Sequence, residues 1–303
     1  MPYFIAMVQT RYKESEKSVA IIGAGSVGRS IGWAVQDSRF SVDSVVSRTV
    51  ESAEALASDL GVEKHSTYLG DSVVSDIIVI CVPDASISLV ADILNSFGSE
   101  LSSKLVVHTS GLATSESLSQ LQNHGAFVAS FHPLQTFTRD RLTAFHELPI
   151  AIEGNPRGVE LANEFAEELG GLPFELSAES KPAYHLAATL LSNYSVVLAR
   201  LAQNILSEPG LPALDAFERL LGTTWANIFS RGPSDSLTGP VSRGDVGTVQ
   251  SHLDLLGSQY PEVQNVYRLL GLEATSMALR QGSIDGETAE EVIRCLTNDA
   301  AAH

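Results

Sequence analysis

A glycine-rich turn close to the start of the chain constrains the fold more than any other feature of the sequence. The apolar run 19–22 is typical of a buried strand, glycines at 23, 25 and 28 follow it as G-x-G-x-x-G, and residues 29–36 continue as a helix. In a dinucleotide-binding fold these glycines make the tight turn, let the backbone approach a pyrophosphate, and let helix and strand pack closely. We therefore predict that a dinucleotide contacts Gly23, Gly25, Ser26, Val27 and Gly28. The alternative is a glycine-rich turn in another α/β protein.

Strand and helix patterns alternate through the first half of the chain. Such alternation favours a parallel, doubly wound Rossmann sheet, an α/β fold. Asp84 is a candidate cap for the helix that ends near 97. The further expected strands are 42–47, 76–82, 104–108, 126–130, 148–153 and 173–176, and the expected helices include 50–60, 114–122 and 156–169.

After residue 177 the sequence predicts helices alone, over 179–206, 213–230, 245–257, 261–281 and 286–298. On the first of these helices, Leu186, Leu190, Val197 and Leu201 share one side and are expected in the core. We therefore expect three segments and a cleft between the last two. They are an N-terminal extension over 1–17, an NADP-binding Rossmann domain over 18–177, and a helical substrate and dimerisation domain over 178–303.

The overall charge limits the possible partners. The formal net charge is −17, which argues against nucleic acid and anionic membranes. The sequence has two cysteines and no apolar run near 18 residues, and its first residues lack the pattern of a signal peptide. These features predict a cytoplasmic protein without disulfides or a structural metal.

The end of the second expected strand predicts which dinucleotide binds. An Asp or Glu there favours NAD through the ribose 2′-hydroxyl, whereas an Arg favours NADP through the 2′-phosphate. The sequence has Ser47, Arg48 and Thr49 at this point and no carboxylate. Because a guanidinium suits a phosphate, we predict NADP(H). The alternative is that Arg48 is a solvated loop residue.

The next strand ends with Cys81, Val82 and Pro83, where ligands bind in open α/β sheets. We expect these residues to line the nicotinamide-ribose side of the cofactor. Cys81 itself is predicted to be a small buried residue and not a nucleophile.

Two further strands bring polar groups to the same edge of the sheet. Ser110 follows one strand and can hydrogen-bond a substrate carboxylate or carbonyl, and His132 follows the next and can orient substrate or move a proton. Taken singly, each is equally well explained as turn chemistry at a strand end.

The first long helix carries a candidate proton donor. Lys181 and His185 are four residues apart and share a face, and Asn193 lies at the edge of the apolar side. A lysine ammonium can stabilise and protonate the alkoxide formed by hydride addition to a carbonyl. The alternative is a solvated lysine in a first helical turn.

A polar loop over 236–245 carries candidate substrate ligands in the second domain. Arg243 can pair with a carboxylate, and Ser236 and Thr238 can supply hydroxyls. An ordinary turn between helices explains the loop equally well.

Together these segments resemble a Rossmann-like oxidoreductase family whose second domain is a domain of unknown function, within the 6-phosphogluconate-dehydrogenase-like superfamily. The first domain also resembles deazaflavin-dependent NADP oxidoreductases. The motifs are the glycine turn, Ser47-Arg48, Val82-Pro-Asp84, His108-x-Ser-Gly111, His132-Pro-Leu134, Lys181-x-x-Tyr-His185 with Asn193, and 237–245.

The resemblance implies a catalytic lysine at Lys181, with His185 where β-hydroxyacid dehydrogenases usually carry Asn. His132-Pro and Ser110 are similar to substrate-facing residues of prephenate dehydrogenases, whose wider signature is absent here. The prediction is an NADPH-dependent reductase of a small carboxylate-bearing 2-oxo acid, similar to ketopantoate reductases and assembled as a homodimer. The alternatives are a prephenate dehydrogenase-like enzyme, an imine (pyrroline-carboxylate) reductase and a non-catalytic NADP(H) sensor.

Overall fold

A computed structural model describes residues 17–297, and the predicted extension over 1–17 lies almost wholly outside these residues. The chain divides into two compact units, one ending at Ser192 and one starting at Asn193. The domain boundary predicted at 177/178 stays a prediction. No helix among the described residues is long and apolar enough to cross a membrane.

The first unit is built on one eight-stranded sheet with the order β3-β2-β1-β4-β5-β6-β7-β8. All neighbouring strands are parallel except β6 and β7, which are antiparallel. The strands are β1 (Ser18–Ile22), β2 (Ser41–Val46), β3 (Lys64–Ser66), β4 (Ile77–Ile80), β5 (Leu105–His108), β6 (Phe127–Pro133), β7 (Pro149–Gly154) and β8 (Leu172–Glu175).

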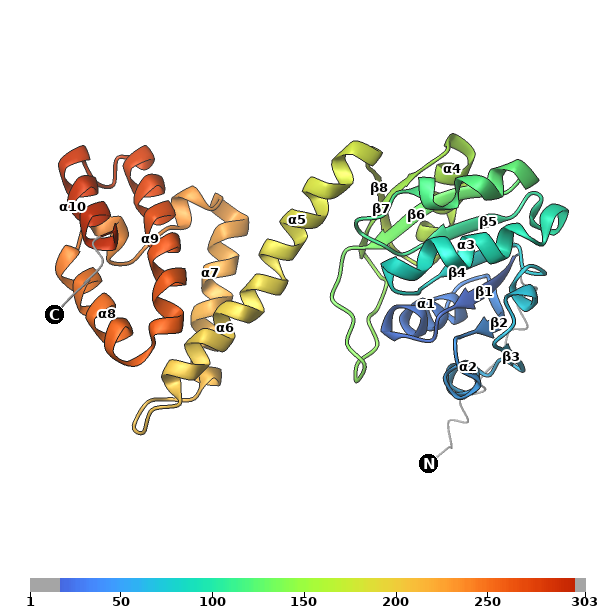
Figure 1. The fold of residues 1–303 in the computed structure, drawn as a ribbon, viewed down its shortest axis with the longest axis horizontal. Helices are drawn as coiled ribbons and strands as arrows, with labels where there is room; N and C mark the ends of the chain where they lie inside the picture. The colour runs from blue at the N-terminus through green and yellow to red at the C-terminus, as the bar shows by residue number, and fades with distance from the viewer. Residues whose placement is uncertain (1–16, 298–303) are drawn as a thin grey trace, which may run out of the picture. The chain divides into compact units, whose positions relative to one another are not determined.

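Helices cover both faces of this sheet (Figure 1). One buried core joins the sheet to α1 (Ser26–Gln36), α2 (Val50–Leu60) and α4 (Pro156–Glu168). The other joins it to α3 (Ile87–Asn95) and the 3₁₀ helix η4 (Ser115–His124). The central strand β4 is apolar throughout and β5 is apolar up to His108, as burial on both faces requires. The predicted α/β Rossmann fold with a helical C-terminal region is confirmed.

Several local predictions differ from the structure. The three-residue strand β3 was not predicted, and residues 115–124 form a 3₁₀ helix where an α-helix was expected. Asp84 starts the short 3₁₀ helix η2 (Asp84–Ser86) and does not cap α3 with its side chain. Residues 134–148 contain no helix, so β7 follows β6 without a helical crossover and pairs with it antiparallel.

The helix expected over 179–206 is two helices, α5 (Lys181–Leu191) and α6 (Asn193–Leu206). Ser192 ends α5 with a backbone ψ of −68°, and the two units divide after it. Leu186, Leu190 and Val197 are about half exposed, so their expected place in the core is wrong for this chain. Leu201 does pack against a buried cluster.

The second unit contains only helices among its described residues. They are α6, α7 (Glu218–Arg231), α8 (Val246–Gln259), α9 (Pro261–Gln281) and α10 (Gly286–Thr297). Val249 and Leu253 of α8 pack against Val292 and Leu296 of α10. The remaining 3₁₀ helices of the chain are η1 (Leu69–Ser72), η3 (Gly98–Leu101), η5 (Ala178–Ser180), η6 (Leu214–Phe217), η7 (Ser234–Ser236) and η8 (Val241–Arg243).

Candidate active site

The glycine turn between β1 and α1 has the geometry that its sequence predicts. Gly23 has a φ of +111°, and a β-carbon on it would lie 2.3 Å from the carbonyl oxygen of Cys81. A β-carbon on Gly28 would lie 2.1 Å from the carbonyl oxygen of Gly23. These two glycines therefore allow close packing of the turn against β4 and α1.

Gly25 differs from the other two glycines. It is exposed, and a β-carbon on it would meet nothing within 4 Å. It is also the N-cap of α1, and no side chain caps that helix. The open backbone and the positive end of α1 are suited to bind a pyrophosphate, as a dinucleotide site requires.

The residues after β2 occupy the predicted place for the 2′-phosphate. Arg48 is exposed and directly precedes Thr49, the N-cap of α2. The Thr49 hydroxyl accepts the backbone N–H of Ser52 at 3.3 Å, so it already has a structural role. The backbone N–H of Ser47 donates to Ser66 of β3. Arg48 is therefore the group of this segment best placed to meet a phosphate.

Cys81 lies at the end of β4, beside the glycine turn. Its backbone N–H donates to Ile22 at 2.7 Å, and burial raises the pKa of its thiol to about 12. A thiol with this pKa is protonated at neutral pH and is a poor nucleophile. Val82 and Pro83 follow it, the first half-buried and the second exposed.

Lys181 is the most unusual residue of the first unit, because it is a lysine with only 1% of its surface exposed. Its Nζ donates to the carbonyl oxygen of Ser110 at 3.2 Å and to the hydroxyl of Ser130. Ser110 follows β5, and Ser130 lies in the middle of β6, opposite the last residue of β5, whereas the lysine starts α5. The strand predicted to end at 130 continues to 133, so His132 lies within β6 and does not follow it. The fold thus brings the ammonium of Lys181 to the end of β5, where the sequence predicts a site.

Burial makes the charged form of this lysine less favourable than that of an exposed lysine. It lowers the pKa of Lys181 to about 8, although the carboxylates of Glu153 and Asp84 act in the opposite direction. Glu153 is buried on β7, directly opposite Ser130 of β6. Its carboxylate accepts the backbone N–H and the hydroxyl of Ser115, both at 2.7 Å.

Ser110 is fully hydrogen-bonded within the protein. Its hydroxyl donates to Asp84 at 2.7 Å and accepts the backbone N–H groups of Leu112 and Ala113. The sequence predicts that Ser110 contacts the substrate. For its hydroxyl to donate to the substrate, it must first give up its hydrogen bond to Asp84. In the structure itself, the carbonyl oxygen of Ser110 is the group that meets Lys181.

Three histidines lie near this lysine in the same unit. The Nδ1 of His108 accepts the backbone N–H of Ser110, so its Nε2–H donates to Thr114 and the buried ring is neutral. Nδ1 of His132 is 2.8 Å from the hydroxyl of Tyr184. The rings of His132 and His185 meet edge to face, 6.3 Å apart. Lys181, Ser110, His132 and His185 are therefore brought together, as the sequence predicted for one site.

The other predicted substrate ligands belong to the second unit. Asn193 starts α6 and is exposed, and Thr238 and Arg243 are exposed too. The Ser236 hydroxyl donates to the carbonyl oxygen of Gly232 at 2.7 Å. Their roles toward substrate stay predictions.

Sequence reasoning missed four groups of this site: Asp84 as a carboxylate partner, Ser130, Glu153 and Tyr184. Glu153 had a signal, because it is the one charged residue in the apolar run 149–153. Tyr184 also had one, because it lies a single turn after Lys181. No feature of the sequence around Ser130 or Asp84 distinguishes them from ordinary polar residues in or after a strand.

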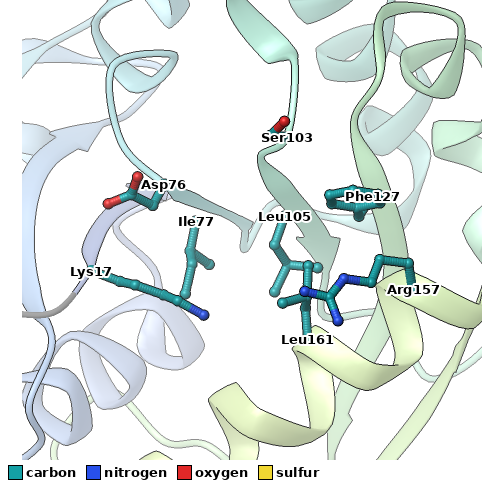
Figure 2. A pocket seen from close by; sticks show the side chains of 8 residues that line it. All are labelled: Lys17, Asp76, Ile77, Ser103, Leu105, Phe127, Arg157 and Leu161. Carbon is teal, nitrogen blue, oxygen red and sulfur yellow. The ribbon is translucent and has the colours of Figure 1, made fainter.

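A hollow of about 510 Å³ lies elsewhere on the first unit, at the edge where β4, β5 and β6 begin (Figure 2). Its charged side chains are used within the protein. Lys17 pairs with Glu164, Asp76 accepts two hydrogen bonds from Ser18, and Arg157 pairs with Glu160. Its lining contains none of the predicted site residues. Among the described residues, no cluster of His, Cys, Asp and Glu is suited to a metal ion.

Comparison with known protein families finds two domains in this chain. A Rossmann-like domain matches residues 7–133, and a domain of unknown function, DUF2520, matches residues 148–274. No curated protein matches the chain.

Solved structures match over most of the chain. The "putative NADP oxidoreductase BF3122" from Bacteroides fragilis is 25% identical with a TM-score of 0.72, covering 86% of this chain and 98% of its own. Protein TM1727 from Thermotoga maritima is 27% identical with a TM-score of 0.65, covering 87% and 99%. An imine reductase from Myxococcus stipitatus in complex with NADP⁺ shares the fold at 19% identity and a TM-score of 0.63, covering 91% and 99%.

The fold and the two domain matches define an α/β Rossmann-type protein. The chain contains a Rossmann-like domain and a DUF2520 domain, as the motifs predicted. Of these neighbours, one is named an NADP oxidoreductase and one holds NADP⁺.

Proposed function

We propose that the protein is an NADPH-dependent reductase of a small 2-oxo acid, with ketopantoate as the first substrate to test. The observation that carries this proposal is the buried ammonium of Lys181 at the end of β5 and beside β6, in the same unit as the glycine turn. A buried cation beside polar strand-end groups is suited to a reaction that develops negative charge on oxygen.

The cofactor is assigned to the glycine turn and the residues after β2. The backbone of Gly23, Gly25 and 26–28 takes the pyrophosphate, and Arg48 with Ser47 takes the 2′-phosphate. Cys81, Val82 and Pro83 line the nicotinamide-ribose side, and the open backbone at Gly25 supports this placement. When bound, the dihydronicotinamide supplies a hydride to the carbonyl carbon.

The chain's own residues bind the substrate and supply the proton. Lys181 has three N–H donors, two of which have partners in the structure, and the third is assigned to the substrate oxygen. His132 and His185 hold the carboxylate. The roles toward substrate that the sequence predicts for Arg243, Ser236, Thr238 and Asn193 of the second unit stay predictions. Ser110 joins them if its hydroxyl exchanges its bond to Asp84.

A substrate panel tests this proposal. The purified protein is incubated with NADPH and 2-oxo acids that include ketopantoate, and NADPH consumption is followed by absorbance. Turnover of a 2-oxo acid supports the proposal. Turnover of a cyclic imine alone, or of prephenate with NADP⁺ alone, supports the alternative enzyme classes, and tight NADPH binding without any turnover supports a sensor.

The location and assembly are also proposed. We infer a cytoplasmic protein, as the sequence predicts. We also infer a homodimer, because α6 and α7 carry large apolar side chains that are half or more exposed, among them Tyr194, Val196, Leu220 and Phe229. Light scattering on the purified protein measures the mass directly. A mass of one chain at micromolar concentration contradicts the dimer.

A further inference from the structure

Glu153 is a buried carboxylate in an otherwise apolar stretch of β7. The two residues before it, Ala151 and Ile152, are buried, and only 8% of the surface of Glu153 itself is exposed. A carboxylate in such a place is unfavourable unless hydrogen bonds or a nearby cation compensate for the loss of water. The position therefore requires partners within the protein.

One partner of this carboxylate is Ser115. Its backbone N–H and its hydroxyl donate to the two carboxylate oxygens of Glu153, both at 2.7 Å. Accepting at both oxygens suits the ionised form, because a protonated carboxyl group would donate from one of them. Ser115 begins η4, so these bonds also hold the 3₁₀ helix against the sheet. Taken alone, they would give Glu153 a purely structural role.

The antiparallel pairing of β7 with β6 also places Glu153 beside the buried lysine. Glu153 is directly opposite Ser130, and residues directly opposite each other direct their side chains to the same face of the sheet, with β-carbons about 5 Å apart. The hydroxyl of Ser130 accepts a hydrogen bond from Nζ of Lys181. The carboxylate and the ammonium are therefore separated by one serine, and both are buried.

The two charges act on each other through space. Nζ of Lys181 donates to Ser110 and Ser130, whereas the oxygens of Glu153 accept from Ser115. Buried charges are screened much less than exposed ones, so an attraction over several ångströms remains substantial. Glu153 thus favours the charged form of Lys181 without a shared hydrogen bond.

Asp84 is the other carboxylate that acts on Lys181, and its setting is different. It starts η2, is exposed, and accepts the hydroxyl of Ser110 at 2.7 Å. Its charge is therefore screened by solvent, so we expect its effect on the ammonium to be smaller than that of Glu153.

The remaining titratable groups near Lys181 supply no anion. Burial lowers the pKa of His108 on β5, and it lowers the pKa of His132 on β6 to about 4, so both rings are neutral at neutral pH. On α5 itself, burial raises the pKa of Tyr184 to about 12, so this phenol keeps its proton. His185 lies one turn after the lysine and is not an acid that forms an anion.

We propose that Glu153 is a positioning residue for the reaction, the buried counter-charge that keeps Lys181 protonated and hydrogen-bonded to Ser110 and Ser130 at neutral pH. Ser115 holds the carboxylate in the place where it can do this. The inference rests on the proposed function, in which the ammonium of Lys181 is the acid.

The ionisation of Lys181 can be measured in the full chain without any turnover. The sequence contains five lysines, so the ¹³Cε and ¹⁵Nζ signals of lysine-labelled protein can be followed one by one through a pH titration, with Lys181 assigned by Lys181→Met. The pKa of Lys181 is about 8 in the native chain. In Glu153→Gln it should fall to about 7 or below, because a nearby opposite charge is lost.

Two further variants serve as comparisons in this titration. Ser115→Ala keeps the carboxylate and removes one of its hydrogen bonds, and Asp84→Asn removes the exposed charge, so both should lower the pKa of Lys181 less than Glu153→Gln does. An unchanged pKa of Lys181 in folded Glu153→Gln overturns the inference, as does a larger fall in Asp84→Asn. The titration uses protein without substrate, so failure here is distinct from an absence of turnover with NADPH.

Melting temperatures at pH 6 separate a counter-charge from a structural role, even where Glu153→Gln is too unstable for the titration. Removing one partner of a buried charge pair leaves the other uncompensated, whereas replacing both removes that penalty. The double variant Lys181→Met with Glu153→Gln should therefore melt at a higher temperature than Glu153→Gln alone. The matched control is Ser115→Ala, which Lys181→Met should not rescue. A double variant that melts no higher than Glu153→Gln contradicts the inference.

Discussion

Lys181 donates a hydrogen bond to the carbonyl oxygen of Ser110 at 3.2 Å, although 71 residues separate them in the chain. Lys181 begins α5 and Ser110 follows β5, so this bond joins the start of the helix to an end of the sheet. It places a buried cation at the edge where the Rossmann fold binds its ligands. The proposed chemistry depends on this placement.

The pH dependence of turnover should reflect this cation. Burial lowers the pKa of Lys181 to about 8 against the opposing effect of Glu153 and Asp84, so the ammonium is present below about pH 8 and is lost above it. Because the ammonium is the proposed acid, kcat should be level below about pH 8 and fall about tenfold per pH unit above it. A kcat that stays level to pH 10 contradicts this role.

Arg48→Ala should weaken NADPH binding and leave NADH binding nearly unchanged. A lost charged hydrogen bond corresponds to about 1.5–3 kcal/mol, or roughly ten- to a hundredfold in the dissociation constant for NADPH. Fluorescence titration with both nucleotides measures the two constants. The matched control is Arg219→Ala, an exposed arginine of the second unit. Equal weakening of both nucleotides by Arg48→Ala contradicts recognition of a 2′-phosphate.

Two glycines of the turn should respond differently to the same change. Gly25→Ala adds a methyl group into open space, so the melting temperature should change by less than about 2 °C while NADPH binding falls. Gly28→Ala places its methyl group 2.1 Å from the carbonyl oxygen of Gly23 and should lower the melting temperature by several degrees. Differential scanning fluorimetry and NADPH titration of both variants test this. Native nucleotide affinity in Gly25→Ala contradicts the placement of the pyrophosphate.

The sequence predicted those parts of the molecule that local patterns determine. The turn at Gly23, Gly25 and Gly28 has a fixed spacing, and β1 and β4 are continuous apolar runs. The strand β3 was missed because three residues are too short for a periodic pattern. The antiparallel pairing of β7 was missed because the sheet was predicted to be parallel, although no helix was expected between 130 and 148.

The candidate site was predicted only in part, because its contacts join distant segments. Periodicity placed Lys181 and His185 on one face of a helix, but the partners of Lys181 lie 51 and 71 residues away. The bond between Ser110 and Asp84 likewise links two strand ends. Leu186 and Leu190 lie at the spacing of an apolar helix face, which predicted that they belong to the core. The same spacing also occurs on an apolar helix face that is exposed in a single chain, and both leucines are exposed here.

Lys181→Met tests the central claim most directly. The variant removes the ammonium and keeps a long apolar side chain in its buried place. Lys104→Met is the matched control, because Lys104, near the start of β5, also donates to a backbone carbonyl. The measurement is NADPH consumption with the best 2-oxo acid of the panel, together with NADPH affinity. We expect Lys181→Met to lose about 10²–10⁴-fold in kcat with NADPH affinity unchanged, and Lys104→Met to keep its activity. A folded Lys181→Met variant that turns over at the native rate would contradict the account.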